Sequence, residues 1–184
     1  FSGWKYIAEC MVNLARSSHL NSGIWRKETF WLLMNMKRRC VGEIPKLISD
    51  CFMLISENQS ILIEHAVLWS MESLIPNPNI EISRNVSKYI SNISRNLENR
   101  DVFLKPEGLY TRLDKVSRLL AKKDSEITQN MIVWFEKMLE QDISSFYYPA
   151  STLKKAKHSV MTIINSNEDP IRGLARRFFE KLNT

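Results

Sequence analysis

The chain has 184 residues, of which 44% are hydrophobic and 25% are charged, with only five glycines and six prolines. This composition is typical of a folded, helix-rich protein and excludes a disordered or fibrous chain. The length suits one compact domain or a short run of repeats. A formal net charge of +6 favours anionic partners in general, through an attraction that salt screens.

The cysteines indicate the compartment. Cys10, Cys40 and Cys51 are odd in number and follow no paired spacing, so no disulfide framework is expected. We therefore predict a reducing, nuclear or cytoplasmic location. The longest apolar runs, 30–34 and 131–135, fall far short of the roughly 20 residues that span a bilayer, so no membrane partner is predicted. Because the first residue is a phenylalanine, we expect a fragment of a longer protein.

Apolar residues recur at steps of three and four along most of the chain, which is the period of a helix with one buried face. No stretch alternates with period two for long enough to predict a strand. The sequence therefore predicts an all-α chain of about nine helices. In chain order these helices cover residues 4–16, 24–39, 45–55, 60–75, 80–97, 109–122, 125–141, 149–165 and 170–182.

Prolines and glycines mark the breaks between these helices. The run 76–79, Pro-Asn-Pro-Asn, must end the fourth helix because each proline disfavours helical backbone at the preceding residue. Residues 99–108, with Pro106 and Gly108, read as a connector. We expect a single helical-repeat domain over 1–184, with 99–108 as the candidate seam.

Two helix starts carry capping signals. Asp124 or Ser125 can accept a hydrogen bond from the first turn of the helix that follows. Asp169 can cap the last helix, with Pro170 at its first position, where a proline needs no hydrogen-bond partner.

Five helices share one spacing, in which an aliphatic residue is followed by an aromatic residue seven positions later. Successive pairs begin 38, 20, 45 and 44 residues apart. Three of these intervals lie near the roughly 40 to 47 residues of HEAT and armadillo repeats, and the interval of 20 is a half-step. The pairs are Ile24 with Trp31, Leu62 with Trp69, Ile82 with Tyr89, Ile127 with Trp134, and Ile171 with Phe178.

Two stretches resemble known repeats. Residues 26–35, Arg-Lys-Glu-Thr-Phe-Trp-Leu-Leu-Met-Asn, look like the third helix of an importin-α-type armadillo repeat, and 169–182 resembles the second helix of a HEAT repeat. The resemblance implies a right-handed α-solenoid. In the armadillo family the tryptophan and asparagine hold a bound peptide on the concave surface, which implies that role for Trp31 and Asn35. The other four copies have Ser73, Ile93, Met138 and Leu182 at the asparagine position.

We therefore expect a non-enzymatic protein-interaction scaffold that binds a partner peptide or helix, with an acidic segment as one option. Trp31, Asn35 and Arg38 lie at three- and four-residue steps on one helix face and are the candidate contact residues. The alternative is a basic HEAT-like module that binds nucleic acid or microtubules. For nucleic acid, the basic clusters at 37–39, 154–157 and 172–177 would have to converge on one face; a further basic pair lies at 122–123.

Catalytic and metal chemistry is not expected. The histidines are scattered, and no cysteine or histidine lies at the spacing of a structural zinc site. The sequence contains neither a glycine-rich phosphate loop nor a Gly-x-Ser-x-Gly turn. No enzymatic activity, metal or cofactor is therefore predicted.

Overall fold

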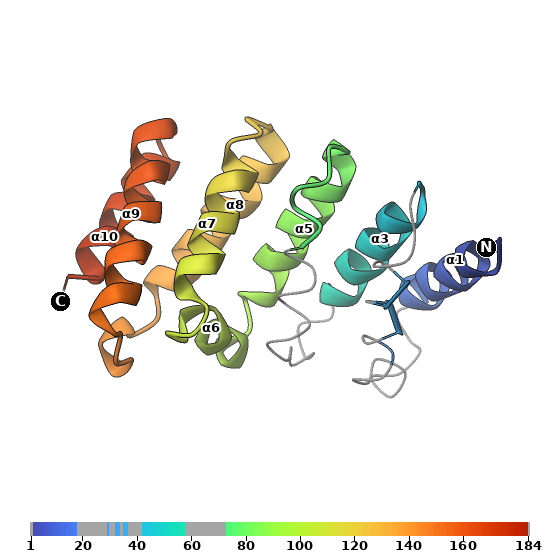
Figure 1. The fold of residues 1–184 in the computed structure, drawn as a ribbon, viewed down its shortest axis with the longest axis horizontal. Helices are drawn as coiled ribbons and strands as arrows, with labels where there is room; N and C mark the ends of the chain where they lie inside the picture. Colours follow the sequence, from blue (N-terminus) through green and yellow to red (C-terminus); the bar gives the residue numbers. More distant parts are fainter. Residues whose placement is uncertain are drawn as a thin grey trace. The chain divides into compact units, whose positions relative to one another are not determined.

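The computed structural model describes residues 2–17, 29, 32–33, 35–36, 42–57 and 73–183. All regular secondary structure in these residues is helical, which confirms the predicted all-α class (Figure 1). The elements are α1 (Ser2–Arg16), α3 (Ile44–Ser56), α5 (Ile80–Ile93), α6 (Leu97–Leu104), α7 (Leu109–Leu120), α8 (Ser125–Leu139), the 3-10 helix η1 (Ile143–Ser145), α9 (Ala150–Ser166) and α10 (Ile171–Lys181).

The chain divides between Asn92 and Ile93 into two compact units. The N-terminal unit contains α1, α3 and all but the last residue of α5, and the C-terminal unit contains α6 to α10. Residues 99–108, the candidate seam, lie inside the C-terminal unit.

In the N-terminal unit α1 packs on α3, and polar side chains join α3 to α5. The Asn85 amide donates to Ser49 Oγ at 3.0 Å and to Asp50 Oδ1 at 2.6 Å. Seven residues later on both helices, Asn92 donates to Ser56 Oγ at 3.1 Å. Seven residues are about two helical turns, so the same contact repeats along the two helices.

The predicted apolar stripe of α5 is confirmed. Tyr89 meets Phe52 of α3 edge to face, with ring centroids 5.8 Å apart, a favourable geometry for aromatic rings. The apolar residues at steps of one, three and four along this helix are all buried: Ile82, Val86, Tyr89, Ile90 and Ile93.

Besides α6 and η1, the C-terminal unit contains two helical hairpins, α7–α8 and α9–α10. Helix α7 packs on α9, α8 packs on α10, and α9 packs on α10. The centre of the core is the Trp134 ring, which lies 5.0 Å from the Phe135 ring, 6.0 Å from Phe103 and 6.3 Å from Phe178. Burial of these large rings supplies much of the hydrophobic free energy of folding.

Three of the five spaced pairs fall on described residues, and their six members are all buried, with at most 2% of each exposed. They are Ile82 with Tyr89, Ile127 with Trp134, and Ile171 with Phe178. The pairs that begin at 24 and 62 have no member among the described residues.

Between α5 and α7 the prediction was wrong. The helix predicted over 80–97 ends at Ile93, and the predicted connector 99–108 contains most of α6. The Asn96 side chain accepts a hydrogen bond from the Glu98 amide at 2.9 Å and so starts a new helix at Leu97. Only 105–108 remain as the turn into α7.

The two capping predictions had different outcomes. Asp124 caps α8 by accepting from the amides of Glu126 and Ile127, each at 3.1 Å, which confirms one of the two candidates. The predicted cap of the last helix was wrong, because α10 begins at Ile171 after Pro170 and receives no side-chain cap.

Two predicted helices fall mainly on residues outside the described part of the chain. Of 24–39, only 29, 32, 33, 35 and 36 are described, and all five are helical. Of 60–75, only 73–75 are described, and these form a turn.

Candidate functional site

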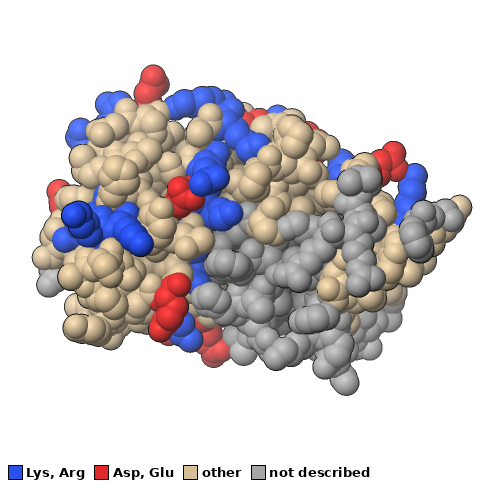
Figure 2. Space-filling view, viewed as in Figure 1, with Lys and Arg blue, Asp and Glu red and all other residues tan. Residues whose placement is uncertain are grey.

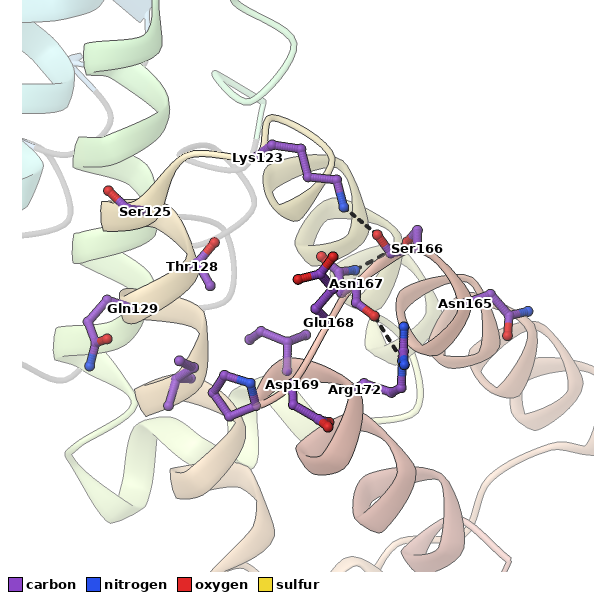
Figure 3. A pocket seen from close by; sticks show the side chains of 13 residues that line it. Lys123, Ser125, Thr128, Gln129, Asn165, Ser166, Asn167, Glu168, Asp169 and Arg172 are labelled. Atoms are coloured by element: carbon purple, nitrogen blue, oxygen red, sulfur yellow. Dashed lines mark hydrogen bonds between the residues drawn. The ribbon is translucent and has the colours of Figure 1, made fainter.

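An open groove of about 710 Å³ lies in the C-terminal unit, where the starts of α8 and α10 meet the end of α9 (Figure 3). Ten of its thirteen lining residues are polar, among them two basic and two acidic residues. The lining residues are Lys123, Ser125, Thr128, Gln129, Ile132, 165–169, Pro170, Ile171 and Arg172.

Both basic side chains of this groove bind backbone carbonyls at the end of α9. Lys123 Nζ donates to the Ser166 carbonyl, and Arg172 Nε donates to the carbonyls of Asn167 at 2.9 Å and Ile164 at 3.3 Å (Figure 3). The last carbonyls of a helix have no intrahelical partner and form its negative end. These two cations therefore stabilise the end of α9.

Other helix ends of the C-terminal unit are closed in the same way, by basic side chains that come from elsewhere in the unit. The donor and acceptor pairs are Lys181 with the Leu139 carbonyl at the end of α8 (2.7 Å), Arg112 with the Phe103 carbonyl in α6 (3.0 Å), and Arg100 with the Ser94 carbonyl after α5 (2.8 Å). Five basic side chains of the C-terminal unit thus have a structural role.

A smaller hollow of about 330 Å³ is lined by Glu136, Leu139, Glu140 and Arg177. The Glu140 carboxylate lies 2.6 Å from Lys137 Nζ and 2.8 Å from Arg100 Nη1. The hydrogen bond from Lys137, with the charges of Lys137 and Arg100, holds the pKa of Glu140 below its usual value. Glu140 therefore stays ionised at neutral pH and is poorly suited to act as a proton donor.

The lysines of α9 differ from the cations at the helix ends. Lys154 and Lys155 are exposed, and neither these two nor the half-buried Lys157 forms an ion pair within the described residues. Lys155 Nζ lies 5.7 Å from the centre of the Tyr110 ring of α7, within the range of a cation–π contact. Figure 2 shows blue side chains gathered over α9 and α7 on the face it presents.

The candidate contact residues are only partly described. Asn35 is helical and half-buried, so its amide retains some access to solvent. Trp31 and Arg38 lie outside the described residues, and the proposed grouping of the three side chains remains a prediction.

The basic clusters do not form one continuous surface in the C-terminal unit. Lys123 and Arg172 meet at the end of α9, whereas 154–157 lie in its first half, about 13 Å or more along the helix axis. Arg177 lies beside Glu136 and Glu140. The cluster at 37–39 falls outside the described residues.

Sequence reasoning missed the contact between Lys155 and Tyr110, which are 45 positions apart. The signal that could have found it is the repeat interval of 44 to 45 residues. Residues separated by one repeat lie side by side when consecutive repeats stack.

The cysteines and the ionisable side chains offer no assembled centre in the described part of the chain. No group of three or more His, Cys, Asp or Glu side chains there is placed to hold a metal ion. Cys51 is buried, and burial raises the pKa of its thiol to about 12, whereas Cys10 is exposed. Among the helices described, none has the length and apolar character needed to cross a bilayer.

Comparison with known proteins found no match for this chain among family models, curated proteins or solved structures. The class that the fold defines is therefore an all-helical protein, and its function is argued from its own residues.

Proposed function

We propose that the chain is a short run of ARM/HEAT-like repeats, a right-handed α-solenoid that binds a segment of another protein without catalysing a reaction. The observation that carries this proposal is the contact between Trp134 and Phe178, whose ring centroids are 6.3 Å apart. These rings are the aromatic members of two consecutive spaced pairs, 44 residues apart. Contact between equivalent residues of successive units is expected of stacked repeats.

Side-chain hydrogen bonds support the same interval. Five of them in the C-terminal unit join residues that are 40 to 44 positions apart in the sequence. Examples are Asp101 with Gln141 and the Leu104 carbonyl with Tyr148. Helix α7 packs on α9 and α8 packs on α10, so each helix contacts the equivalent helix of the next hairpin.

From this architecture follows the class of function. Stacked repeats present long surfaces made of parallel helices, which suit an extended or helical partner segment. Trp31, Asn35 and Arg38 are the contact residues that we propose for this segment. A nuclear or cytoplasmic location is proposed because the cysteines are odd in number and follow no paired spacing in the sequence.

A selection experiment tests this function. The folded chain is used to select binders from a displayed library of random peptides, and we expect peptides with roughly micromolar Kd. The double variant N35A/R38A should weaken the selected peptide about tenfold, measured by fluorescence anisotropy. Its unfolding temperature should stay close to that of the unmodified chain.

The matched control is N13A/R16A, which removes the same two residue types from exposed positions of α1. It should leave peptide affinity unchanged. If the selection yields no binder, the proposed function is wrong; if both double variants bind alike, the three contact residues are wrong.

Exposed lysines of α9 favour a second candidate, a basic module that binds nucleic acid or microtubules. Binding carried by phosphate contacts loses affinity steeply with salt, by a power close to the number of contacts. Duplex and single-stranded nucleic acid are therefore titrated from low to physiological salt, and microtubules are tested by co-sedimentation. Absence of binding in both assays would eliminate this candidate.

A further inference from the structure

Helix α9 carries a second stripe of residues on the side opposite its core. Its buried face contains Ala156, Ser159, Val160, Ile163 and Ile164. The outer α9 stripe consists of Lys154, Lys157, His158 and Met161, at steps of three and four. These four positions fall within about 100° of the helix circumference and extend over about 10 Å of its length.

No structural demand explains the outer α9 stripe. Helix α9 contains no acidic residue, and the side chains of Lys154 and Lys157 form no hydrogen bond or ion pair with the described part of the chain. On the neighbouring helix α7 the single acid, Asp114, is already paired with Arg118 at 2.9 Å. The lysines of the stripe are therefore available to a carboxylate from outside.

Apolar surface adjoins these charges. Met161 is 39% exposed at the end of the stripe, and Tyr110, on the flank of α9, is 38% exposed beneath Lys155. A partner that matched this surface would present carboxylates for the lysines and an aliphatic side chain for Met161. Such a combination is typical of an amphipathic acidic helix.

The surface fits nucleic acid less well. A protein that tracks the phosphate backbone needs a continuous basic path that contacts several phosphates. The lysines of α9 are isolated from Lys123 and Arg172, which close the end of the helix.

We propose that the outer α9 stripe binds an acidic amphipathic helix of a partner protein, with Lys154 and Lys157 contacting its carboxylates and Met161 its apolar residue. This inference rests on the proposed function and names the partner and a second contact surface for it.

The probe is a fluorescein-labelled helical peptide of about 18 residues, a length at which an isolated helix is formed to a useful degree. It carries glutamates at i and i+3 and a leucine at i+7, to match Lys154, Lys157 and Met161. The double variant K154E/K157E should weaken binding at least about tenfold in anisotropy titrations. A peptide with lysines in place of the glutamates should bind the variant K154E/K157E more tightly than it binds the unmodified chain.

The control variant K115E/R176E changes the net charge by the same amount at α7 and α10. It should bind the acidic peptide within about twofold of the unmodified chain. Circular dichroism establishes that each variant is folded before titration.

Three results would overturn the inference. They are equal weakening by both double variants, absence of binding by the acidic peptide, and displacement of the peptide by duplex nucleic acid at physiological salt. If the acidic peptide gives one of these three results while peptides selected from the random library still bind the unmodified chain, only the α9 surface is refuted and the proposed function stands.

Discussion

Basic residues have two different roles in the C-terminal unit: some bind carbonyls at helix ends, and others remain as charges at the surface. Lys123 and Arg172 reach helix-end carbonyls, where their charge compensates the negative end of α9. Lys154 and Lys157 point to no such acceptor in the described residues and remain charges at the surface. A count of basic residues therefore overestimates the charge that is available to a partner.

The two described cysteines should differ in reactivity. Burial, with the nearby charge of Asp50, raises the pKa of the Cys51 thiol to about 12, so the reactive thiolate is scarce at pH 8. Maleimide treatment of the native chain at pH 8 should label Cys10, which is exposed, and leave Cys51 unmodified. Peptide mapping by mass spectrometry measures both sites.

In denaturant the same treatment should label Cys51 as well. Rapid labelling of Cys51 in the native chain would contradict its burial.

At the scale of single helices, closure of the helix ends matters as much as the apolar stripes. Helix α9 ends at Ser166, and three backbone carbonyls near this end accept hydrogen bonds from Lys123 and Arg172. Asn167 adds a side-chain bond to the Ile163 carbonyl at 2.9 Å. The end of this helix thus depends on residues of two other segments.

Substitution of Arg172 by alanine should therefore destabilise the chain by about 1–2 kcal/mol, because two carbonyls lose a charged donor. Chemical denaturation followed by circular dichroism measures this loss. Arg176→Ala is the matched control on the same helix, since Arg176 is exposed, and it should change stability by less than about 0.5 kcal/mol. Equal losses in the two variants would show that the bonds of Arg172 contribute nothing.

Apolar periodicity predicted most of the helices, because a buried stripe at steps of three and four is a local property of the sequence. It failed at Asn96, where one capping side chain divides a segment that is amphipathic throughout. The capping prediction failed at Asp169, since a capping residue type does not ensure a capping geometry.

The candidate site was harder to predict, because the roles of the lysines depend on packing between hairpins. The cluster at 154–157 was visible in the sequence. The sequence did not show that Lys123 binds the Ser166 carbonyl, 43 residues away, at the end of α9. Local patterns contain no information on which carbonyl a long side chain will reach.

For the whole molecule, the division between Asn92 and Ile93 has an energetic meaning. The C-terminal unit has its own aromatic core around Trp134. A domain of this size can bury enough surface to fold alone.

We therefore expect the fragment 93–184 to fold by itself. It should be helical by circular dichroism and unfold cooperatively with an enthalpy of about 60 kcal/mol near 60 °C. Trp134 is the sole tryptophan of this fragment and is 1% exposed, so its fluorescence should be blue-shifted until unfolding. A fragment that lacks helical signal would show that its core requires the N-terminal unit.

The repeat interval has a further consequence for the order in which the unit folds. Five side-chain hydrogen bonds of the C-terminal unit join residues that are 40 to 44 positions apart in the sequence, so each closes a loop of that length. Because loop-closure entropy grows only with the logarithm of loop length, these contacts all cost nearly the same to form. None of them requires residues near 93 to meet residues near 184. Folding can therefore begin at either hairpin and extend to the next, with no single late step in which distant ends must find each other.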